Sequence, residues 1–586
     1  MKFLALGDTD GIGASCHFLD LNGTGLVLDA GTDPQRDGPD SLPRFDWVQD
    51  RADSYVDHAI VTHAHHDHMG SLPVLVRQFP HALAHMTGAT KKLLDFLLPA
   101  SARLQKKRRD KGETSHDPLF TEDELEALHH LYLTHDLGRD FDLTGPKGAA
   151  SVTGQFYSAG HILGSAGVEL HFEEWGRERR LFYTSDTNMQ AQTIIPGGEY
   201  PETTDTLILE TTQGAEPEAE ATSRPEERER FRKTLARVLT QGGTALIPVF
   251  VMGRAQEMLV LLGQLKREGA IPRSVPIYTA GSMRAIAEVY DETRDTTPRV
   301  DSDEEVFAVN QERVPYEAEA KREILDGPGI MVVSSGMMLE PTLSNVLARR
   351  IVENEKDAVL LVGHPAEGTP ARRLKDAAAE GPGAPVMLAD GHGPQPVHCT
   401  VERFRFSGHS DRRDLLSLVG RMNPETVLLV HGDPEARAWM AEHIEADHPD
   451  TDVHRPDWGS VIEVQPSSLC RASACGIGWH EGVLLQNVEP IAYFVLRSSD
   501  HWRPIPQCPI RNLTLNSRRG PHADDQNRAP IHSPRAAGAP HCRRPPHRRD
   551  DAGALRHRRQ HVRHGAGRRP RAQMHGGRAG RPGGRP

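Results

Sequence analysis

The sequence of 586 residues has no long apolar run, few cysteines and no nucleotide-binding motif. A membrane-spanning helix needs about 20 consecutive apolar residues, and no stretch approaches that length. The segment from Met1 to Asp8 turns polar too early for a secretory signal and is typical of a first β-strand. Neither a G-x-G-x-x-G nor a Walker pattern occurs, so no segment is evidently a nucleotide-binding domain. We therefore expect a cytoplasmic protein with no membrane partner.

Cysteine is especially scarce in the part of the sequence that looks globular. Only Cys16 and Cys399 precede residue 467, and the other four of the six cysteines follow it. Two distant cysteines do not form a disulfide framework, which favours a reduced, cytosolic enzyme. The chain is too long for one hydrophobic core and predicts two or three domains.

Lysine is absent from residues 467–586, which hold 22 arginines and 7 acidic residues. From Arg511 onward Arg, Pro, Gly, Ala and His dominate, and such a composition cannot bury a core. One interpretation is a disordered, arginine-rich arm that binds nucleic acid. The other, which we favour, is an out-of-frame reading of a GC-rich coding sequence, because such a reading yields arginine without lysine. We infer no function from this tail.

A cluster of ligand-type side chains follows the apolar run from Ala59 to Val61, which predicts a short buried strand. Three imidazoles and a carboxylate this close would be costly to bury without a cation, and neutral imidazole and ionised carboxylate are zinc ligands. The H-x-H-x-D-H spacing lets a tight loop direct alternate side chains to two neighbouring metal positions. A histidine-rich surface loop is the alternative interpretation. The four candidate ligands are His63, His65, Asp67 and His68.

Further ligand-type residues stand alone at predicted strand ends or in glycine-flanked turns. His161 lies in such a turn, and Asp186 follows an apolar run that begins at Leu181. A single His or Asp is usually structural, but after H-x-H-x-D-H these two are candidate ligands. Asp29 ends the run that begins at Leu26, where it could orient a ligand histidine from behind or cap a turn. Both roles for Asp29 stay open.

From about residue 203 predicted strands alternate with predicted helices. Ser223-x-x-Glu226 has the pattern of a capping box at a helix start, as Thr121-x-x-Glu124 has earlier in the chain. The alternation predicts a parallel α/β domain with crossover helices. The predicted strands are 206–209, 245–250, 277–279, 330–333 and 358–362.

These motifs, in this order, resemble those of the β-CASP group of metallo-β-lactamase-fold nucleases. The likeness covers nearly all of residues 1–466 and is closest to bacterial and archaeal relatives of the eukaryotic pre-mRNA 3′-end cleavage nuclease. It implies an α/β fold, in which a parallel α/β (β-CASP) domain is inserted into a metallo-β-lactamase αββα sandwich. The boundaries we expect are 1–202 and 386–466 for the metallo-β-lactamase domain, 203–385 for the β-CASP domain, and 467–586 for the tail.

The resemblance also implies a catalytic zinc site with two ions per chain. Two cations about 3.5–4 Å apart can share a hydroxide and clamp a phosphate during in-line displacement. Asp67 is counted as a catalytic residue as well as a ligand. By resemblance, one zinc is held by His63, His65 and His161, the second by Asp67, His68 and His431, and Asp186 bridges them.

The same likeness supplies a candidate general acid. Glu210, His409 and His431 match the three motifs specific to β-CASP proteins. His409, positioned by Glu210, would protonate the leaving sugar oxygen, because a neighbouring carboxylate raises the pKa of an imidazole. The alternative is a structural histidine in a Gly-His-Ser turn.

The function implied is a zinc-dependent ribonuclease, endo- or 5′ exonucleolytic, in RNA processing or decay. One rival is a small-molecule hydrolase of the superfamily, a thioesterase or lactonase, which has no reason to carry Glu210 and His409. Another is a DNA-directed β-CASP nuclease, which typically has valine where His431 stands. The resemblance leaves a homodimer open.

One property opposes an RNA substrate. Residues 1–466 carry 47 basic and 74 acidic side chains, a net charge of −27, which repels a polyanion. Such acidity suits adaptation to high salt, where the screening length falls to about 3 Å at 1 M. Under that hypothesis, local cations such as Arg254, Arg372 and Arg373 would hold the RNA. The basic run 106–109 is either a solvated helix face or a polyanion contact.

Overall fold

The computed structural model describes residues 1–7, 11–50, 55–148, 151–315 and 323–465. The predicted tail, 467–586, lies outside the described residues. None of the described helices is both long and apolar enough to cross a membrane.

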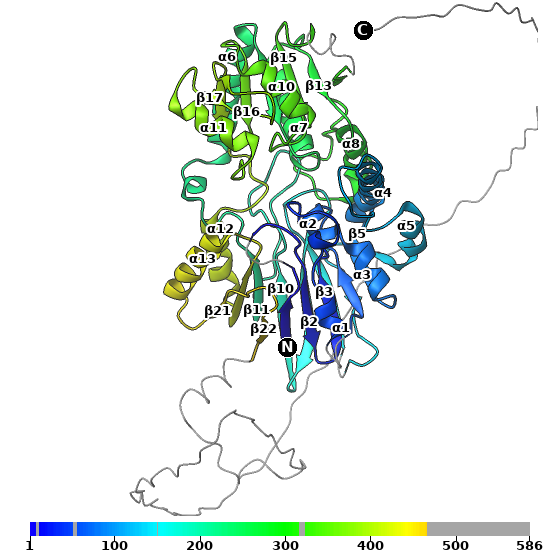
Figure 1. The fold of residues 1–586 in the computed structure, drawn as a ribbon. Helices are drawn as coiled ribbons and strands as arrows, with labels where there is room; N and C mark the ends of the chain where they lie inside the picture. Colours follow the sequence, from blue (N-terminus) through cyan, green and yellow to red (C-terminus); the bar gives the residue numbers. More distant parts are fainter. Residues whose placement is uncertain (8–10, 51–54, 149–150, 316–322, 466–586) are drawn as a thin grey trace, which may run out of the picture. The chain divides into compact units, whose positions relative to one another are not determined.

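Two seven-stranded sheets form the first part of the fold (Figure 1). The first sheet joins the two ends of the described chain, because the strand nearest the carboxyl end of that chain pairs antiparallel with the strand nearest its amino end. Its strands in spatial order are β22 (Val461–Glu463), β1 (Lys2–Ala5), β2 (His17–Leu21), β3 (Thr24–Leu28), β4 (His58–Ile60), β5 (Leu83–Thr87) and β6 (Tyr132–His135).

The second sheet is mixed, with β10, β11, β20 and β21 parallel to one another. It brings together strands from three distant parts of the sequence. In spatial order they are β21 (Asp452–His454), β20 (Thr426–Val430), β11 (Thr206–Glu210), β10 (Arg177–Tyr183), β9 (Ala166–Glu174), β8 (Val152–Ser158) and β7 (Asp140–Asp142).

The inner faces of the two sheets share one hydrophobic core, to which Leu28 and Ile60 contribute from the first sheet and Leu170 and Val430 from the second. The outer faces are covered by helices (Figure 1). Helices α3 (Leu72–Gln78), α4 (Gly88–Asp110) and α5 (Glu122–Leu128) cover the first sheet, and α12 (Arg412–Met422) and α13 (Pro434–Asp447) cover the second. This arrangement confirms the predicted αββα sandwich.

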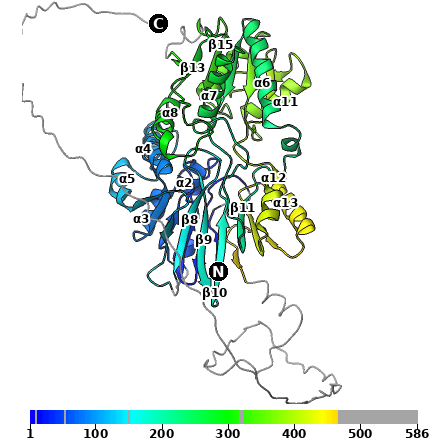
Figure 2. The same cartoon turned by 180° about the vertical axis from the view of Figure 1, so that it is seen from behind.

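A third sheet of six parallel strands forms the second part of the fold (Figure 2). Helices cover both of its faces, as parallel sheets require. The strands in spatial order are β14 (Glu312–Arg313), β13 (Ile277–Thr279), β15 (Gly329–Val333), β12 (Thr244–Pro248), β16 (Ala358–Leu361) and β19 (Thr400–Arg403). The helices are α6 (Arg224–Thr240), α7 (Arg254–Arg267) and α8 (Met283–Glu292) on one face, and α10 (Leu343–Ile351) and α11 (Pro370–Glu380) on the other.

Strand pairing bears on the domain boundaries that we expected at 203 and 385. β11 pairs with β10 and β20 in the second sheet, whereas β19 pairs with β16 in the third. A strand belongs to the sheet that supplies its hydrogen bonds, which alternation along the sequence does not show. We therefore propose that the inserted domain begins after Glu210 and ends after Arg403.

Candidate metal centre

The candidate ligands all follow strands of the sandwich. Four lie in the loop after β4 and in the short helix α2 (His66–Met69) that continues it. The others follow β8, β10 and β20, which run in the same direction, so their carboxyl ends lie at one edge of the second sheet. The fold thus gathers His161, Asp186 and His431 beside the histidine motif.

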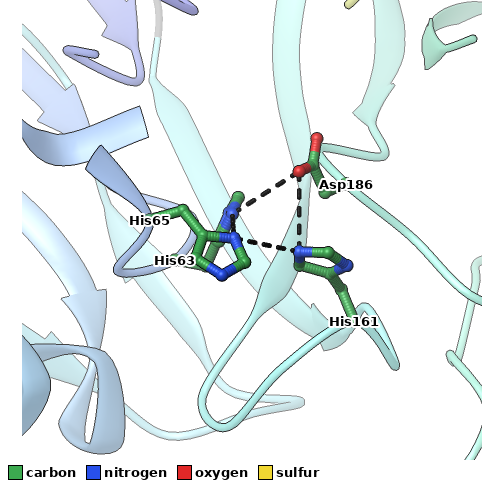
Figure 3. A group of neighbouring side chains, drawn as sticks. All are labelled: His63, His65, His161 and Asp186. Carbon is green, nitrogen blue, oxygen red and sulfur yellow. Dashed lines mark hydrogen bonds and ion pairs between the residues drawn. The ribbon is translucent and has the colours of Figure 1, made fainter. Parts of the chain in front are cut away.

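One group consists of His63, His65, His161 and Asp186, whose ligand atoms lie within 4.8 Å of one another (Figure 3). The Nδ1 atom of His65 is 3.1 Å from Nε2 of His63 and 3.1 Å from Nε2 of His161. A single ring nitrogen cannot donate a hydrogen to two acceptors. Zinc–nitrogen bonds of about 2.0–2.1 Å in tetrahedral geometry separate the nitrogens by about 3.3 Å. These three nitrogens therefore have the spacing of a shared cation.

The second group is formed by Asp67, His68 and His431, again with ligand atoms within 4.8 Å. The Nε2 atoms of His68 and His431 are 3.3 Å apart, and Asp67 Oδ2 lies 3.6 Å from His431 Nε2. The structure thus brings Asp67 and His68, which follow β4, together with His431, which lies near the end of the described chain.

Asp186 lies between the two groups. Its Oδ2 is 3.6 Å from Nε2 of both His63 and His161, while its Oδ1 is 3.3 Å from His68 Nε2. This Oδ1 also lies 3.2 Å from His431 Nδ1, yet it is buried and neither contact has the geometry of a hydrogen bond. A buried carboxylate oxygen without a hydrogen bond is costly, and a cation on each side of the carboxylate would satisfy it. The residues therefore fit a pair of metal ions.

Other residues contact the second ring nitrogen, Nδ1, of two candidate ligands. Asp29 Oδ2 is 2.9 Å from His68 Nδ1, and the Asp29 carboxylate also accepts hydrogen bonds from Thr62 and from the Tyr183 hydroxyl. Asp29 thus has the first of its two predicted roles, because it contacts the Nδ1 atom of His68, a candidate ligand, and orients its ring. His431 Nδ1 lies 3.0 Å from Thr212 Oγ1 and 3.2 Å from Asp186 Oδ1. Such contacts fix the orientation of a metal-binding imidazole.

The buried environment controls the charge of these side chains. Burial, together with neighbouring imidazoles, holds the pKa of His63 and His161 well below the ordinary value. Burial opposes ionisation of Asp186, but His431 and His68 outweigh it and keep the pKa of this carboxyl well below its usual range. Near pH 7 the two imidazoles are neutral and the carboxylate is ionised, which are the forms that bind metals.

A pair of polar residues adjoins the groups. His409 Nδ1 lies 3.0 Å from Glu210 Oε1, and both residues have side-chain atoms within 4.8 Å of Asp186. Glu210 is fully buried and also accepts hydrogen bonds from the backbone N–H groups of Thr187 and Thr212. Burial lowers the pKa of His409, but attraction by Glu210 and Asp186 outweighs it and raises the pKa to about 9. The neighbouring Glu210 carboxylate thus favours the protonated form of His409.

The structure places every predicted metal ligand, together with Glu210 and His409, in this one region. The supporting residues Thr62, Tyr183 and Thr212 were not predicted. Thr and Tyr are common in strands and turns, so no local signal marked them. Thr62 adjoins His63 in sequence, which is the single hint that the motif offered.

Comparisons with known families agree with this architecture. Residues 9–157 match the metallo-beta-lactamase superfamily, residues 255–374 match the Beta-Casp domain, and residues 394–456 match the Zn-dependent metallo-hydrolase RNA specificity domain.

Similar curated proteins occur in eukaryotes and archaea. The chain is 28% identical over 453 residues to "Endoribonuclease YSH1" of Kluyveromyces lactis, which covers 74% of this chain and 55% of that protein. It is 28% identical over 444 residues to "Cleavage and polyadenylation specificity factor 73" of Drosophila melanogaster, covering 74% and 60%. It is 28% identical over 451 residues to "Transcription termination factor FttA" of Methanothermobacter thermautotrophicus, covering 74% and 67%. The chain thus spans little more than half the length of the first of these relatives. The three matched domains, in this order, show that the chain belongs to the β-CASP group of the metallo-β-lactamase superfamily.

Proposed function

We propose that this chain is a zinc-dependent ribonuclease that hydrolyses phosphodiester bonds in RNA. The observation that carries the proposal is the His409–Glu210 pair beside Asp186. A phosphodiester bond has a poor leaving group that needs a proton, and a protonated histidine next to the metal groups can supply one. The names of the endoribonuclease relatives support the same substrate class.

Two zinc ions fit the donor set best, because neutral imidazole and carboxylate are zinc ligands. In this proposal His63, His65 and His161 would hold one ion, and Asp67, His68 and His431 would hold the other, with Asp186 lying between the two groups. When bound, such a pair lowers the pKa of water and stabilises the charge that develops on a phosphate.

The remaining chemistry falls to the side chains of the protein. Glu210 Oε1 faces His409 Nδ1, which leaves Nε2 as the nitrogen that can donate to a leaving oxygen. The other two hydrogen bonds to Glu210 fix its carboxylate, so the imidazole cannot rotate without losing its partner. Asp67 contributes as a ligand of the second ion. Glu210 is thus a positioning residue, and His409 is the general acid.

Two alternatives differ from this proposal in the substrate. A thioesterase or lactonase would use the metal ligands without His409, and a DNA-directed enzyme would share the whole site. RNA is favoured over DNA by His431 and by the match of residues 394–456 to an RNA specificity domain. Endonucleolytic and 5′ exonucleolytic cutting both remain compatible with this proposal. The cytoplasmic location and the homodimer remain predictions.

The test is incubation of the purified full chain with end-labelled RNA and DNA of the same sequence, with and without a chelator. We expect RNA cleavage that the chelator abolishes and added zinc restores. Hydrolysis of thioesters or lactones by a protein that leaves RNA intact would refute the proposal.

A further inference from the structure

Arg254 lies where a parallel sheet presents its binding edge. It is the first residue of α7 and follows Gly253, which has a φ of 80°, in the loop after β12. Ligands of parallel α/β sheets bind at the carboxyl ends of the strands. The N-terminus of a helix also favours anions, because its backbone N–H groups are unpaired and its dipole is positive there.

The guanidinium of Arg254 makes no hydrogen bond or ion pair with the other described residues, although its side chain is only partly exposed. Its Nη1 atom is buried without an acceptor. A guanidinium has five N–H donors. Leaving a charged donor desolvated and unpaired costs more free energy than leaving a neutral donor unpaired. No acceptor among the described residues pairs with this guanidinium, so it is available to bind an anion from outside the protein.

A second arginine stands beside the first. Arg224, the first residue of α6, donates from Nη1 to the Ser407 carbonyl at 3.2 Å. Burial and the positive charge of Arg224 lower the pKa of Arg254 to about 10. The nearby carboxylate of Glu257 is occupied by backbone N–H groups of the segment 193–195. Within the part of the chain that the structure describes, no carboxylate thus forms an ion pair with either of these two cations.

The other arginines expected to hold RNA are already engaged. Arg372 pairs with Asp376 at 2.9 Å, and Arg373 donates to the carbonyls of Met387 and Gly368. The Arg372–Asp376 pair lies within one helix, while the partners of Arg373 are known only from the structure. Arg254 alone of the three arginines is left without a partner among the described residues.

The position of Arg254 relative to the metal groups follows from Gly408. A Cβ atom added at Gly408 would lie 3.1 Å from His161 Nδ1 and 3.4 Å from Arg254 Nη2. His161 directs its other nitrogen, Nε2, to the first metal group. The guanidinium therefore lies on the far side of the His161 ring, next to the loop that carries His409.

We propose that Arg254, assisted by Arg224, binds an RNA phosphate that flanks the scissile phosphate on the leaving-group side. The inference rests on the proposed ribonuclease function and on His409 as the group that marks the leaving-group side. The planar fork of an arginine suits two phosphate oxygens. A phosphate here would satisfy the unpaired donors and place the leaving oxygen near His409.

The experiment uses the full chain and short RNAs that carry one neutral methylphosphonate linkage at a single position. With wild-type protein, neutralising the flanking linkage on the leaving-group side should raise KM about tenfold to a hundredfold, the worth of a charged hydrogen bond. Arg254→Gln should raise KM on unmodified RNA by a similar factor, and the same methylphosphonate should then cause no further loss. The plot of log binding constant against log salt concentration should become less steep by about 0.7, the value for one lost phosphate contact on a single strand.

Arg232→Gln is the matched control, because Arg232 lies two turns along α6 and pairs with Glu229. This variant should keep the KM and the methylphosphonate sensitivity of the wild type. A folded Arg254→Gln protein with wild-type KM and sensitivity would overturn the inference. If Arg254→Gln does not fold, the methylphosphonate series with wild-type protein is the test. A wild-type KM that no methylphosphonate on the leaving-group side changes would also overturn the inference. A wild-type protein that cuts no RNA at all would instead refute the proposed function.

Discussion

His409 and Glu210 are 199 residues apart in the sequence, yet His409 Nδ1 lies 3.0 Å from Glu210 Oε1. Glu210 is the last residue of β11 in the second sheet, and His409 follows β19, a strand of the third sheet, by six residues. The pair therefore forms only when the chain returns to the sandwich. The insertion separates the proposed acid from its carboxylate in sequence but not in space.

The first prediction concerns this acid. His409→Ala should lower RNA cleavage by about 10²–10⁴, the usual contribution of general acid catalysis, because the leaving oxygen then lacks a proton donor. Metal content should equal that of the wild type, since His409 belongs to neither proposed ligand set. An RNA with a bridging 5′-sulfur needs no proton at that atom and should restore the rate. Wild-type cleavage of ordinary RNA by His409→Ala would contradict the assignment.

Asp67→Ala provides the contrast to His409→Ala. Loss of this carboxylate should weaken metal binding itself, so less than two ions per chain should be found by metal analysis. The sulfur-containing RNA should not rescue this variant, because its defect lies before proton transfer. Rescue of both variants alike would show that the two residues do not have separate roles.

The second prediction concerns pH. A general acid must be protonated, so the rate should fall as pH rises through the pKa of His409, which is raised by Glu210 and Asp186. Glu210→Gln removes one of these negative charges and should lower that pKa. The alkaline limb of the pH–rate profile should then move to lower pH. An unchanged limb would show that Glu210 does not act through His409.

The third prediction concerns Asp29, whose carboxylate faces His68. Asp29 has a φ of 59°, and Asn tolerates this left-handed conformation better than most residues, so Asp29→Asn removes the charge with little backbone strain. Zinc affinity measured against a competing chelator should fall about tenfold to a hundredfold, as for other residues behind a metal ligand. Asp20→Asn, a change at the turn near Gly23, is the control and should leave the affinity unchanged.

The fourth prediction concerns three histidines outside the site. His85 is buried between His58 and His135, with ring nitrogens 3.0 and 2.9 Å away, and burial lowers its pKa to about 3. The unfolded chain takes up this proton below its ordinary pKa of about 6.5, while the folded chain does not. The free energy of unfolding should therefore drop by about 2 kcal/mol from this group between pH 6.5 and 5. His85→Asn should reduce that pH dependence in chemical denaturation, and an identical slope would contradict it.

The fifth prediction concerns the end of the described chain. β22 ends at Glu463 and pairs with β1, so all the strands described for the first sheet lie before residue 466. A chain that stops after 466 should keep the melting temperature and the RNA cleavage rate of the full chain. A large fall in either quantity would assign the tail to the fold or to the substrate path.

Local sequence patterns predicted the local features well. The capping boxes at Thr121 and Ser223 are present at the starts of α5 and α6, because both depend on side chains three residues apart. The loop after β4 was predicted for the same reason, since its four ligand-type residues lie within six positions.

Features that depend on distant neighbours were not predictable. β11 looks like any strand before a helix, and only its pairing with β20 assigns it to the second sheet. Arg372 pairs with Asp376 four residues along its own helix, a local contact that the sequence spacing allows, whereas the lack of a partner at Arg254 depends on what the fold places around its guanidinium. The choice between the two roles of Asp29 required the position of His68, 39 residues away.

The distance in sequence between His68 and His431, 363 residues, has a consequence for synthesis on the ribosome. At about 5–20 residues per second, translation needs roughly 20–70 s to proceed from one to the other. During that interval the nascent chain holds the histidine motif but not the last ligand of the second metal group, and His409 also emerges late. Under the proposed ribonuclease function, the chain would therefore be inactive on RNA at least until translation has passed His431.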